Sequence, residues 1–150
     1  MACCYGYSQL FNKNVMVRKV ILSFTVFLIS FCASAKQFPH SYWEKTINAI
    51  IKVESRGNTN VVNGDCAGPM QISRILVKQC NTILKQKKSS KRFSLSDRFS
   101  INESKEMFYL IQETYNPEGN IEKAIRSWNG GINYSVSKTN RYLRKVKAEM

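Results

Sequence analysis

The sequence predicts a mainly α fold, a small helical domain with at most a minor β-hairpin near residues 58–68. Apolar residues recur at helical spacing in several segments, and the first of these stripes consists of Trp43, Ile47, Ile50 and Ile51. Candidate N-caps precede the stripes, whereas alternating strand patterns are almost absent. A chain of 150 residues is expected to form one compact domain.

The N-terminal segment is expected to lie outside that domain. A basic and then apolar stretch over 18–31 is followed by Ala33-Ser34-Ala35, a small-x-small pattern that suits signal peptidase. Residues 1–35 are therefore predicted to be a leader with a secretory signal peptide, for which Met16 is an alternative start, and residues 36–150 the folded domain. The protein would be exported to the periplasm or the extracellular space, or would stay membrane-anchored if the signal is not cleaved.

The first half of the domain is predicted to contain two helices joined by turns. Ser41 and Glu44 form a capping box that begins a helix over 41–55, and Gly57 is placed to end it. The Asn- and Gly-rich segment that follows indicates turns or a small hairpin at Asn63-Gly64. A helical pattern resumes over Pro69–Leu84, and the basic stretch after it is most simply a solvated loop.

The second half predicts three more helices. Ser100 and Glu103 form a second capping box, before a stripe made of Met107, Phe108, Ile111 and Tyr115. Asn120 caps a short helix that Gly130-Gly131 ends. The last helix presents one apolar side, made of Thr139, Tyr142, Leu143 and Val146.

Glu54 is the most informative polar residue, because it falls on the apolar stripe of the first helix. A carboxyl group that faces the core has a raised pKa and can donate a proton near neutral pH. The alternative is that the helix has already ended, since Ser55, Arg56 and Gly57 follow, and that the carboxylate is solvated.

The two cysteines of the exported domain, Cys66 and Cys80, are expected to form a disulfide in an oxidising compartment. Closing a loop of about 15 residues would contribute roughly 3 kcal/mol in the chain-entropy model. The alternative is a pair of unpaired buried thiols.

Composition excludes several kinds of chemistry. With His40 as the single histidine, neither a Ser-His-Asp hydrolase nor a zinc site is expected, and no glycine-rich phosphate loop is present. We expect no metal and no other cofactor. The net charge of +13 indicates an anionic partner such as a cell wall, a membrane or nucleic acid, but no nucleic-acid-binding motif is present and we expect no nucleic acid.

Four motifs in order resemble the lytic transglycosylases of the lysozyme-like superfamily, and the resemblance covers most of residues 36–150. They are Glu54-Ser55 with Gly57-Asn58, Gly68-Pro69-Met70-Gln71-Ile72-Ser73, Ser127-Trp128-Asn129-Gly130-Gly131, and Arg141-Tyr142 through Val146. Two departures stand out: Pro69 replaces a usual leucine, and Ser127-Trp128-Asn129 replaces a usual alanine-tyrosine-asparagine. Both motifs retain their polar residue, Gln71 in the first and Asn129 in the second, so the departures concern the details of substrate binding more than the reaction.

The resemblance implies a lysozyme-like fold and cleavage of the β-1,4 bond between N-acetylmuramic acid and N-acetylglucosamine in peptidoglycan. Glu54 matches the glutamic acid that first protonates the glycosidic oxygen and then, as a carboxylate, deprotonates the muramic C6 hydroxyl to close a 1,6-anhydro ring. A single acid with a raised pKa suits that alternation.

The same match suggests roles for the other motif residues. Gln71 and Ser73 would hydrogen-bond the sugar or its peptide stem, Asn129 would orient an acetamido group, and Met70 would form an apolar wall. Tyr142 would position Glu54 or the substrate. Met70 and Tyr142 also lie on apolar stripes, so both are alternatively plain core residues. Ser55 and Trp128 are expected to support the site.

Other functions stay open at this stage. A muramidase would need a second carboxyl group about 5–9 Å from Glu54, for which Asp65 and Asp97 are the candidates, each also explained as a local turn or cap residue. A non-catalytic glycan-binding or assembly protein on the same fold is the further alternative. The expected partner is peptidoglycan, with a secretion or conjugation apparatus as a second candidate, and the protein is expected to be a monomer.

Overall fold

The computed structural model describes residues 38–150, so the predicted signal segment, its cleavage after Ala35 and the alternative start at Met16 lie outside the described residues. The described chain is mainly helical, as predicted. Its helices are α2 (His40–Ser55), α3 (Arg74–Gln86), α4 (Ile101–Tyr115), α5 (Ile121–Gly130) and α6 (Val136–Ala148), with a 3-10 helix, η1, at Ser96–Phe99. In these residues no helix is long and apolar enough to cross a membrane.

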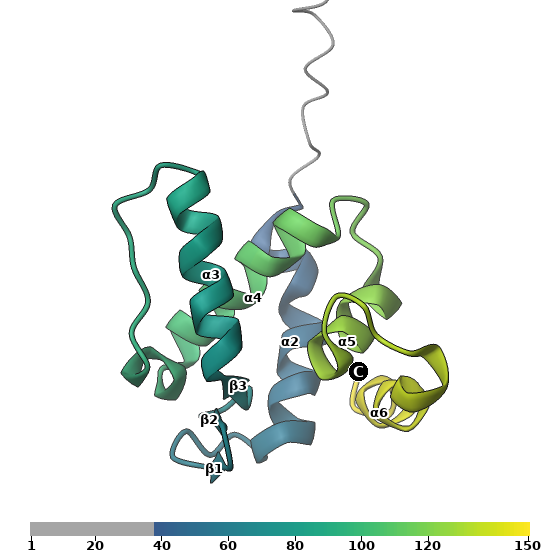
Figure 1. Ribbon diagram of the computed structural model, residues 1–150. Helices are drawn as coiled ribbons and strands as arrows, with labels where there is room; N and C mark the ends of the chain where they lie inside the picture. Colours follow the sequence, from purple (N-terminus) through teal and green to yellow (C-terminus); the bar gives the residue numbers. More distant parts are fainter. Residues whose placement is uncertain (1–37) are drawn as a thin grey trace, which may run out of the picture. The chain divides into compact units, whose positions relative to one another are not determined.

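Helix α2 carries the predicted apolar stripe into the core. Trp43, Ile47 and Ile50 are buried, as the helical spacing predicts. Helices α5 and α6 pack against α2, while α3 packs against α4 (Figure 1). The end of α2, which holds Glu54, is thereby brought close to residues from the second half of the chain.

The predicted capping box at the start of α2 is wrong. Pro39 occupies the N-cap position, and no side chain caps the helix there. The Glu44 carboxylate instead accepts hydrogen bonds from Lys105 Nζ at 2.7 Å and Tyr109 Oη at 2.8 Å, both on α4. Two partners on α4, one of them a lysine ammonium, thus satisfy the Glu44 carboxylate in place of the single backbone N–H of a capping box.

A three-stranded antiparallel sheet follows α2, in the order β1 (Val62–Asn63), β2 (Cys66–Ala67), β3 (Ile72–Ser73). Strands β1 and β2 form the predicted hairpin, in which Asn63 faces Cys66. The third strand was not predicted: Cys66 also faces Ser73 on β3.

The predicted helix over Pro69–Leu84 therefore begins too early. Because Ile72 and Ser73 pair with β2, α3 starts only at Arg74. Ser73 is its N-cap, and Ser73 Oγ accepts a hydrogen bond from the Leu76 N–H at 3.2 Å. Pro69 consequently lies in the turn between β2 and β3, not in the first turn of a helix.

The starts of α4 and α5 are capped by the residues that the sequence predicts, but the second capping box is only half formed, because the Ser100 N–H donates to Asp97 O at 3.1 Å and Glu103 Oε2 pairs with Lys91 Nζ at 3.0 Å. Ser100 Oγ accepts a hydrogen bond from the Glu103 N–H at 3.3 Å, and Asn120 Oδ1 accepts one from the Lys123 N–H at 2.9 Å. Helix α5 ends at Gly130, followed by Gly131 with a φ of 76°. The predicted apolar side of α6 is buried.

One buried cation fixes α6 against α5. Arg126 is only 6% exposed. Its Nη1 atom donates to Val136 O, Thr139 Oγ1 and Asn140 Oδ1 at 2.9 Å each, and Nη2 pairs with Glu122 at 2.8 Å. These bonds set the position of α6, and therefore of Tyr142, relative to α5.

Candidate active site

A cavity of about 460 Å³ lies beside the C-terminal end of α2. Glu54 lines it, together with the strand residues Asn63, Cys66 and Ser73 and the turn residue Gln71. The first turns of α3 and the end of α5 complete the lining with Ile75, Leu76, Gln79, Ser127, Trp128, Asn129 and Gly131. The fold thus brings Glu54, Gln71, Ser73, Trp128 and Asn129, all predicted from sequence, to one cavity.

Glu54 is half-buried and is held by Tyr142. Tyr142 Oη donates a hydrogen bond to Glu54 Oε1 at 2.6 Å, which joins α6 to the end of α2. The second carboxyl oxygen, Oε2, has no hydrogen bond within residues 38–150. One carboxyl oxygen is therefore held by Tyr142, while the other is available to a ligand.

Burial raises the pKa of Glu54 above its ordinary value. The hydrogen bond from Tyr142 and the positive charge of Lys145 act in the opposite direction and limit the rise in pKa. The pKa of Tyr142 is itself raised, first by burial and then by the Glu54 charge, so its hydroxyl remains a neutral donor. The prediction that Glu54 faces the core with a raised pKa agrees with this environment, and the solvated alternative does not.

Gln71 lies at a strained point of the turn that leads into β3. Its φ of 50° is in the left-handed region, which costs a non-glycine residue about 1 kcal/mol. Gln71 Nε2 donates to Gly68 O at 3.0 Å and to Val61 O at 3.2 Å. These bonds fix the side-chain amide in the cavity wall and leave its oxygen as an acceptor. Such strain is typical of functional sites.

Two predicted supporting residues, one on α2 and one on α5, donate hydrogen bonds to the Pro69-Met70 turn. Ser55 Oγ donates to Pro69 O at 2.9 Å from the end of α2. Trp128 Nε1 donates to Met70 O at 3.1 Å from α5, and the indole ring packs against Phe108 with a centroid distance of 5.2 Å. The turn that carries Gln71 is thus anchored to both helices.

Met70 does not form the predicted wall of the site. Its side chain is 0% exposed and belongs to the hydrophobic core. Met70 contributes to the site through its backbone carbonyl, which accepts the hydrogen bond from Trp128. The core alternative, which the apolar stripe had left open, describes this side chain correctly.

Glu54 is the single carboxyl group among the described residues that line the cavity. The Asp65 side chain is 73% exposed and lies 3.6 Å from Arg74 in an ion pair. Asp97 Oδ2 accepts a hydrogen bond from the Ser94 N–H at 2.7 Å, which is the local cap expected for it. Neither acid lies in the cavity wall beside Glu54.

Several lining residues were not predicted. Ile75 and Gln79 are four residues apart on α3, so they lie on the same side of the helix that begins after Ser73. This spacing was the sequence feature that could have predicted them as neighbours of Ser73 in the cavity wall. Ile75 is 74% exposed at this surface. Asn63 reaches the cavity through the strand pairing of β1 and β2, which sequence spacing alone does not reveal.

The predicted disulfide is absent, because Cys66 and Cys80 are both free. Cys80 is fully buried on α3, with Sγ 3.9 Å from Met107 O on α4. Cys66 is half-buried on β2 and lines the cavity. Helix α3 begins at Arg74 and directs Cys80 into the core, whereas strand pairing places Cys66 in the cavity wall. The two thiols therefore lie in different environments.

This arrangement predicts unequal reactivity of the two thiols. Burial raises the pKa of Cys80 to about 12, which leaves almost no thiolate at neutral pH. Iodoacetamide should therefore alkylate Cys66 in the folded protein at least about tenfold faster than Cys80, measured by peptide mass mapping. Protection of both cysteines until a reductant is added would instead show that the disulfide forms in solution.

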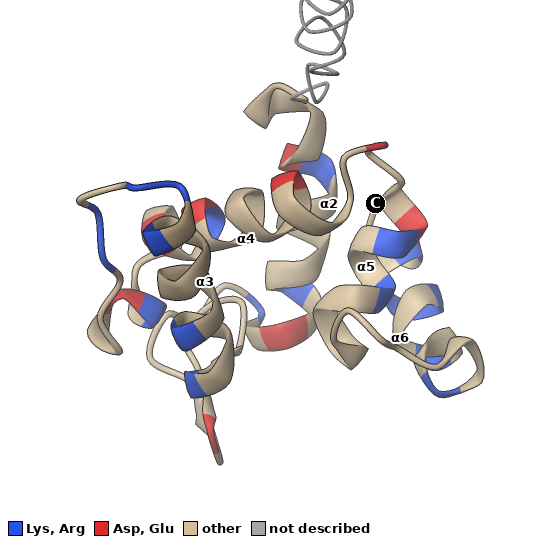
Figure 2. Cartoon of the chain, turned by 45° about the horizontal axis from the view of Figure 1, so that its top comes forward, with Lys and Arg blue, Asp and Glu red and all other residues tan. Residues whose placement is uncertain are grey.

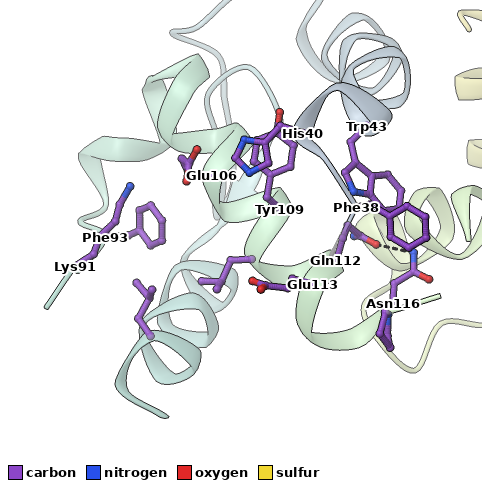
Figure 3. Close-up of a pocket in the computed structure, with 13 residues that line it drawn as sticks. Phe38, His40, Trp43, Lys91, Phe93, Glu106, Tyr109, Gln112, Glu113 and Asn116 are labelled. Atoms are coloured by element: carbon purple, nitrogen blue, oxygen red, sulfur yellow. Dashed lines mark hydrogen bonds between the residues drawn. The ribbon is translucent and has the colours of Figure 1, made fainter. Parts of the chain in front are cut away.

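A second cavity, of about 180 Å³, lies near the opposite end of α2 (Figure 3). His40 stacks on Tyr109 there, with ring centroids 3.8 Å apart. Gln112 Oε1 accepts a hydrogen bond from Asn116 Nδ2 at 3.0 Å, whereas Gln112 Nε2 has no partner in the described chain. None of the residues predicted for the site lines this cavity.

Comparisons of the chain with protein-family models, with curated proteins and with solved structures find no match. Within residues 38–150 no group of three or more His, Cys, Asp or Glu side chains could hold a metal ion.

Proposed function

We propose that the protein is a peptidoglycan lytic transglycosylase. It would cleave the β-1,4 bond between N-acetylmuramic acid and N-acetylglucosamine and leave a 1,6-anhydromuramoyl end. The observation that carries this proposal is one half-buried carboxyl group, Glu54, held by Tyr142 at the wall of a cavity with no second carboxyl among its described lining residues. This substrate lies outside the cytoplasmic membrane, and the predicted signal segment would supply the export that the proposal requires.

In this reaction Glu54 acts first as an acid and then as a base. The carboxylic acid donates its proton to the glycosidic oxygen as the bond from that oxygen to C1 of the muramic ring breaks. The resulting carboxylate then removes the proton of the C6 hydroxyl while the C6 oxygen bonds to C1 and closes the 1,6-anhydro ring. The acid is thereby regenerated and no water is consumed. The raised pKa of Glu54 favours the protonated form that must begin the cycle.

The polar lining of the cavity suits a neutral, amide-bearing sugar. Its side chains include the amides of Asn63, Gln79 and Asn129 and the hydroxyl of Ser127, and no lysine or arginine is among its described lining residues. Amides and hydroxyls can bind the acetamido and hydroxyl groups of N-acetylated sugars, and the half-buried indole of Trp128 offers an apolar surface. A cavity volume of about 460 Å³ falls in the usual range for ligand sites.

The products distinguish this proposal from its alternatives. Purified peptidoglycan would be incubated with residues 36–150, and the soluble fragments analysed by mass spectrometry. Anhydromuramoyl ends, about 18 Da lighter than hydrolytic ends by loss of one water, are the expected result. Reducing muramic ends would instead identify a muramidase, and the absence of fragments a non-catalytic glycan-binding protein.

Tyr142→Phe should lower the cleavage rate by about 10-fold to 100-fold, because Glu54 loses the 2.6 Å hydrogen bond that orients it. That bond lowers the pKa of Glu54, so its removal should raise the pKa further. The high-pH limb of the rate profile, where the acid form is lost, should move to higher pH. An unchanged profile with a lower rate would show that Tyr142 does not act on the ionisation of Glu54.

A further inference from the structure

The second cavity, of about 180 Å³, has walls that are mostly apolar (Figure 3). Its described lining comes from the start of α2, the end of α3, the loop after α3, and α4 with the turn that follows it. Aromatic rings and two leucines form most of it, namely Phe38, Trp43, Phe93, Tyr109, Leu84 and Leu110. Cavities of similar size with apolar walls hold water poorly and take up apolar molecules. A large apolar group is therefore the expected occupant.

Two buried N–H donors at this cavity have no partner. Trp43 is only 3% exposed, its indole N–H makes no hydrogen bond within residues 38–150, and the nitrogen edge of its ring faces the cavity (Figure 3). Gln112 is 1% exposed, and its Nε2 is likewise unpartnered in the described chain. Because Gln112 Nε2 is fully enclosed, the donor that a ligand can reach is the indole of Trp43. Buried donors are rarely left unpaired, so the ligand is expected to bring an acceptor oxygen.

The cavity also contains an unpaired carboxylate, that of Glu106. All the acidic residues of the chain lie in the described part, among more numerous lysines and arginines (Figure 2). Every other acid accepts a hydrogen bond or pairs with a cation, whereas Glu106 does neither within residues 38–150. Glu106 is half-buried and lies one turn before Tyr109 on α4. A ligand in the cavity can therefore bring a cation to it.

The one lysine of the described lining is already engaged. Lys91 Nζ pairs with Glu103 at 3.0 Å and lies 4.8 Å from the centre of the Phe93 ring. Lys91 is thus held by its own neighbours and does not neutralise Glu106. The cavity consequently offers an apolar space, one accessible N–H donor and one unpaired carboxylate.

We propose that this cavity is an anchor pocket for a peptide segment of a partner protein. One phenylalanine side chain of the segment would fill the apolar space, and a main-chain carbonyl beside it would accept the hydrogen bond from Trp43 Nε1. A neighbouring lysine or arginine of the segment would pair with Glu106. The proposal does not depend on the function proposed for the Glu54 cavity, which has a separate lining.

The size and chemistry of the cavity favour a peptide anchor over other occupants. Its volume of about 180 Å³ is below the range of roughly 300 to 1,000 Å³ that small-molecule sites usually have. Single aromatic side chains that fill small pockets are the usual anchors of protein interfaces. A sugar would place several hydroxyl groups against apolar walls, where they would lose hydrogen bonds to water without replacement.

The test follows the two indole N–H signals of the ¹⁵N-labelled protein by NMR while the peptide acetyl-Gly-Lys-Phe-Gly-amide is added up to about 10 mM. The Trp43 signal should move with a Kd of about 1 mM, a value suited to one anchor side chain. The Trp128 signal should stay, because its Nε1–H is already bonded to Met70 O at 3.1 Å. Replacing phenylalanine by alanine in the peptide should raise the Kd about tenfold or more.

Glu106→Gln tests the contact with the cation. It should raise the Kd of the lysine peptide about threefold and leave that of acetyl-Gly-Gln-Phe-Gly-amide within about twofold, since only the first peptide is charged. Glu118→Gln is the matched control, because it makes the same change at an exposed acid outside the cavity. It should leave both Kd values within about twofold. Equal weakening of both peptides by Glu106→Gln would contradict the proposed ion pair.

Trp43→Phe removes the indole donor and keeps an aromatic ring. It should raise the Kd about threefold or more, followed through the backbone signals of α4. Thermal unfolding verifies the fold, and if this variant unfolds, the alanine peptide and Glu106→Gln decide the question. A Trp43 signal that does not move, or equal affinity for the phenylalanine and alanine peptides, would overturn the proposal. A shift caused by N-acetylglucosamine and not by the peptide would overturn it in favour of a second sugar site.

Discussion

Glu54→Gln is expected to slow glycan cleavage by about 10²-fold to 10⁴-fold, the range in which general acid–base groups contribute. The amide keeps the size of the carboxyl group, and its oxygen can still accept the hydrogen bond that Tyr142 Oη donates at 2.6 Å in the native protein. It has no acidic proton to give to the glycosidic oxygen. The initial rate of fragment release from purified peptidoglycan measures the effect.

Asp65→Asn is the matched control, because it makes the same chemical change at an exposed acid outside the cavity. Its rate should stay within about twofold of the native rate. A loss comparable to that of Glu54→Gln would indicate a mechanism with two carboxyl groups, as in a muramidase, and would contradict the single-acid assignment.

The stability of Glu54→Gln should change in the opposite direction to its activity. Because burial raises the pKa of Glu54, the native protein loses stability as the pH rises from the ordinary pKa of a glutamic acid through the folded-state pKa. The amide does not ionise and avoids this loss. The Tm of the variant should therefore exceed the native Tm above the folded-state pKa, with a difference that shrinks at lower pH. Scanning calorimetry across that range of pH tests the sign of the difference in Tm. If the variant is unfolded, its loss of activity says nothing about the mechanism.

Gly68→Ala is expected to destabilise the fold by about 3 kcal/mol or more. A Cβ atom at Gly68 would lie 1.7 Å from Arg98 O and 2.6 Å from Arg98 C, both backbone atoms of η1. The φ of 79° adds strain for any residue with a side chain. Since Gly68 O also accepts the bond from Gln71 Nε2, any shift that relieves the clash would displace the cavity wall. Urea denaturation of residues 36–150 gives the change in unfolding free energy.

Gly64→Ala separates the two causes. Gly64 has a φ of 57°, but a Cβ atom there meets nothing within 4 Å. The variant should lose only about 1 kcal/mol, the cost of the left-handed conformation. Equal losses at Gly64 and Gly68 would show that the close approach to Arg98 is not what destabilises the Gly68 variant.

Features that depend on near neighbours in the chain could be predicted from the sequence. Helical spacing placed Trp43 and Ile47 in the core and put Glu54 on the same side of α2. The caps at Ser100 and Asn120 were predicted for the same reason, because each bond joins residues three apart.

Features that depend on distant partners could not. The Glu44 carboxylate fits a local capping box equally well until α4 brings Lys105 and Tyr109 beside it. Because β3 pairs with β2, α3 begins at Arg74 and not at the predicted Pro69. The environments of both cysteines therefore differ from those expected from the sequence. An apolar residue at position 70 of the Gly68–Ser73 motif is compatible with a cavity wall and with the core. Only the packed fold shows that the Met70 side chain is completely buried.

For this protein the sequence by itself determined a mainly helical fold, the end of α2, the start of α4, both ends of α5 and an acid on the apolar side of the first helix. Those properties follow from periodicities and caps that act over one or two turns. The tertiary structure decided that Tyr142 donates to Glu54, one of the two roles that the resemblance implied for it. It alone decided that no other carboxyl lies in the described cavity wall and that the two cysteines are free. The physical reason is that burial and hydrogen-bond partners are set by contacts between segments distant in the chain, which no local pattern specifies.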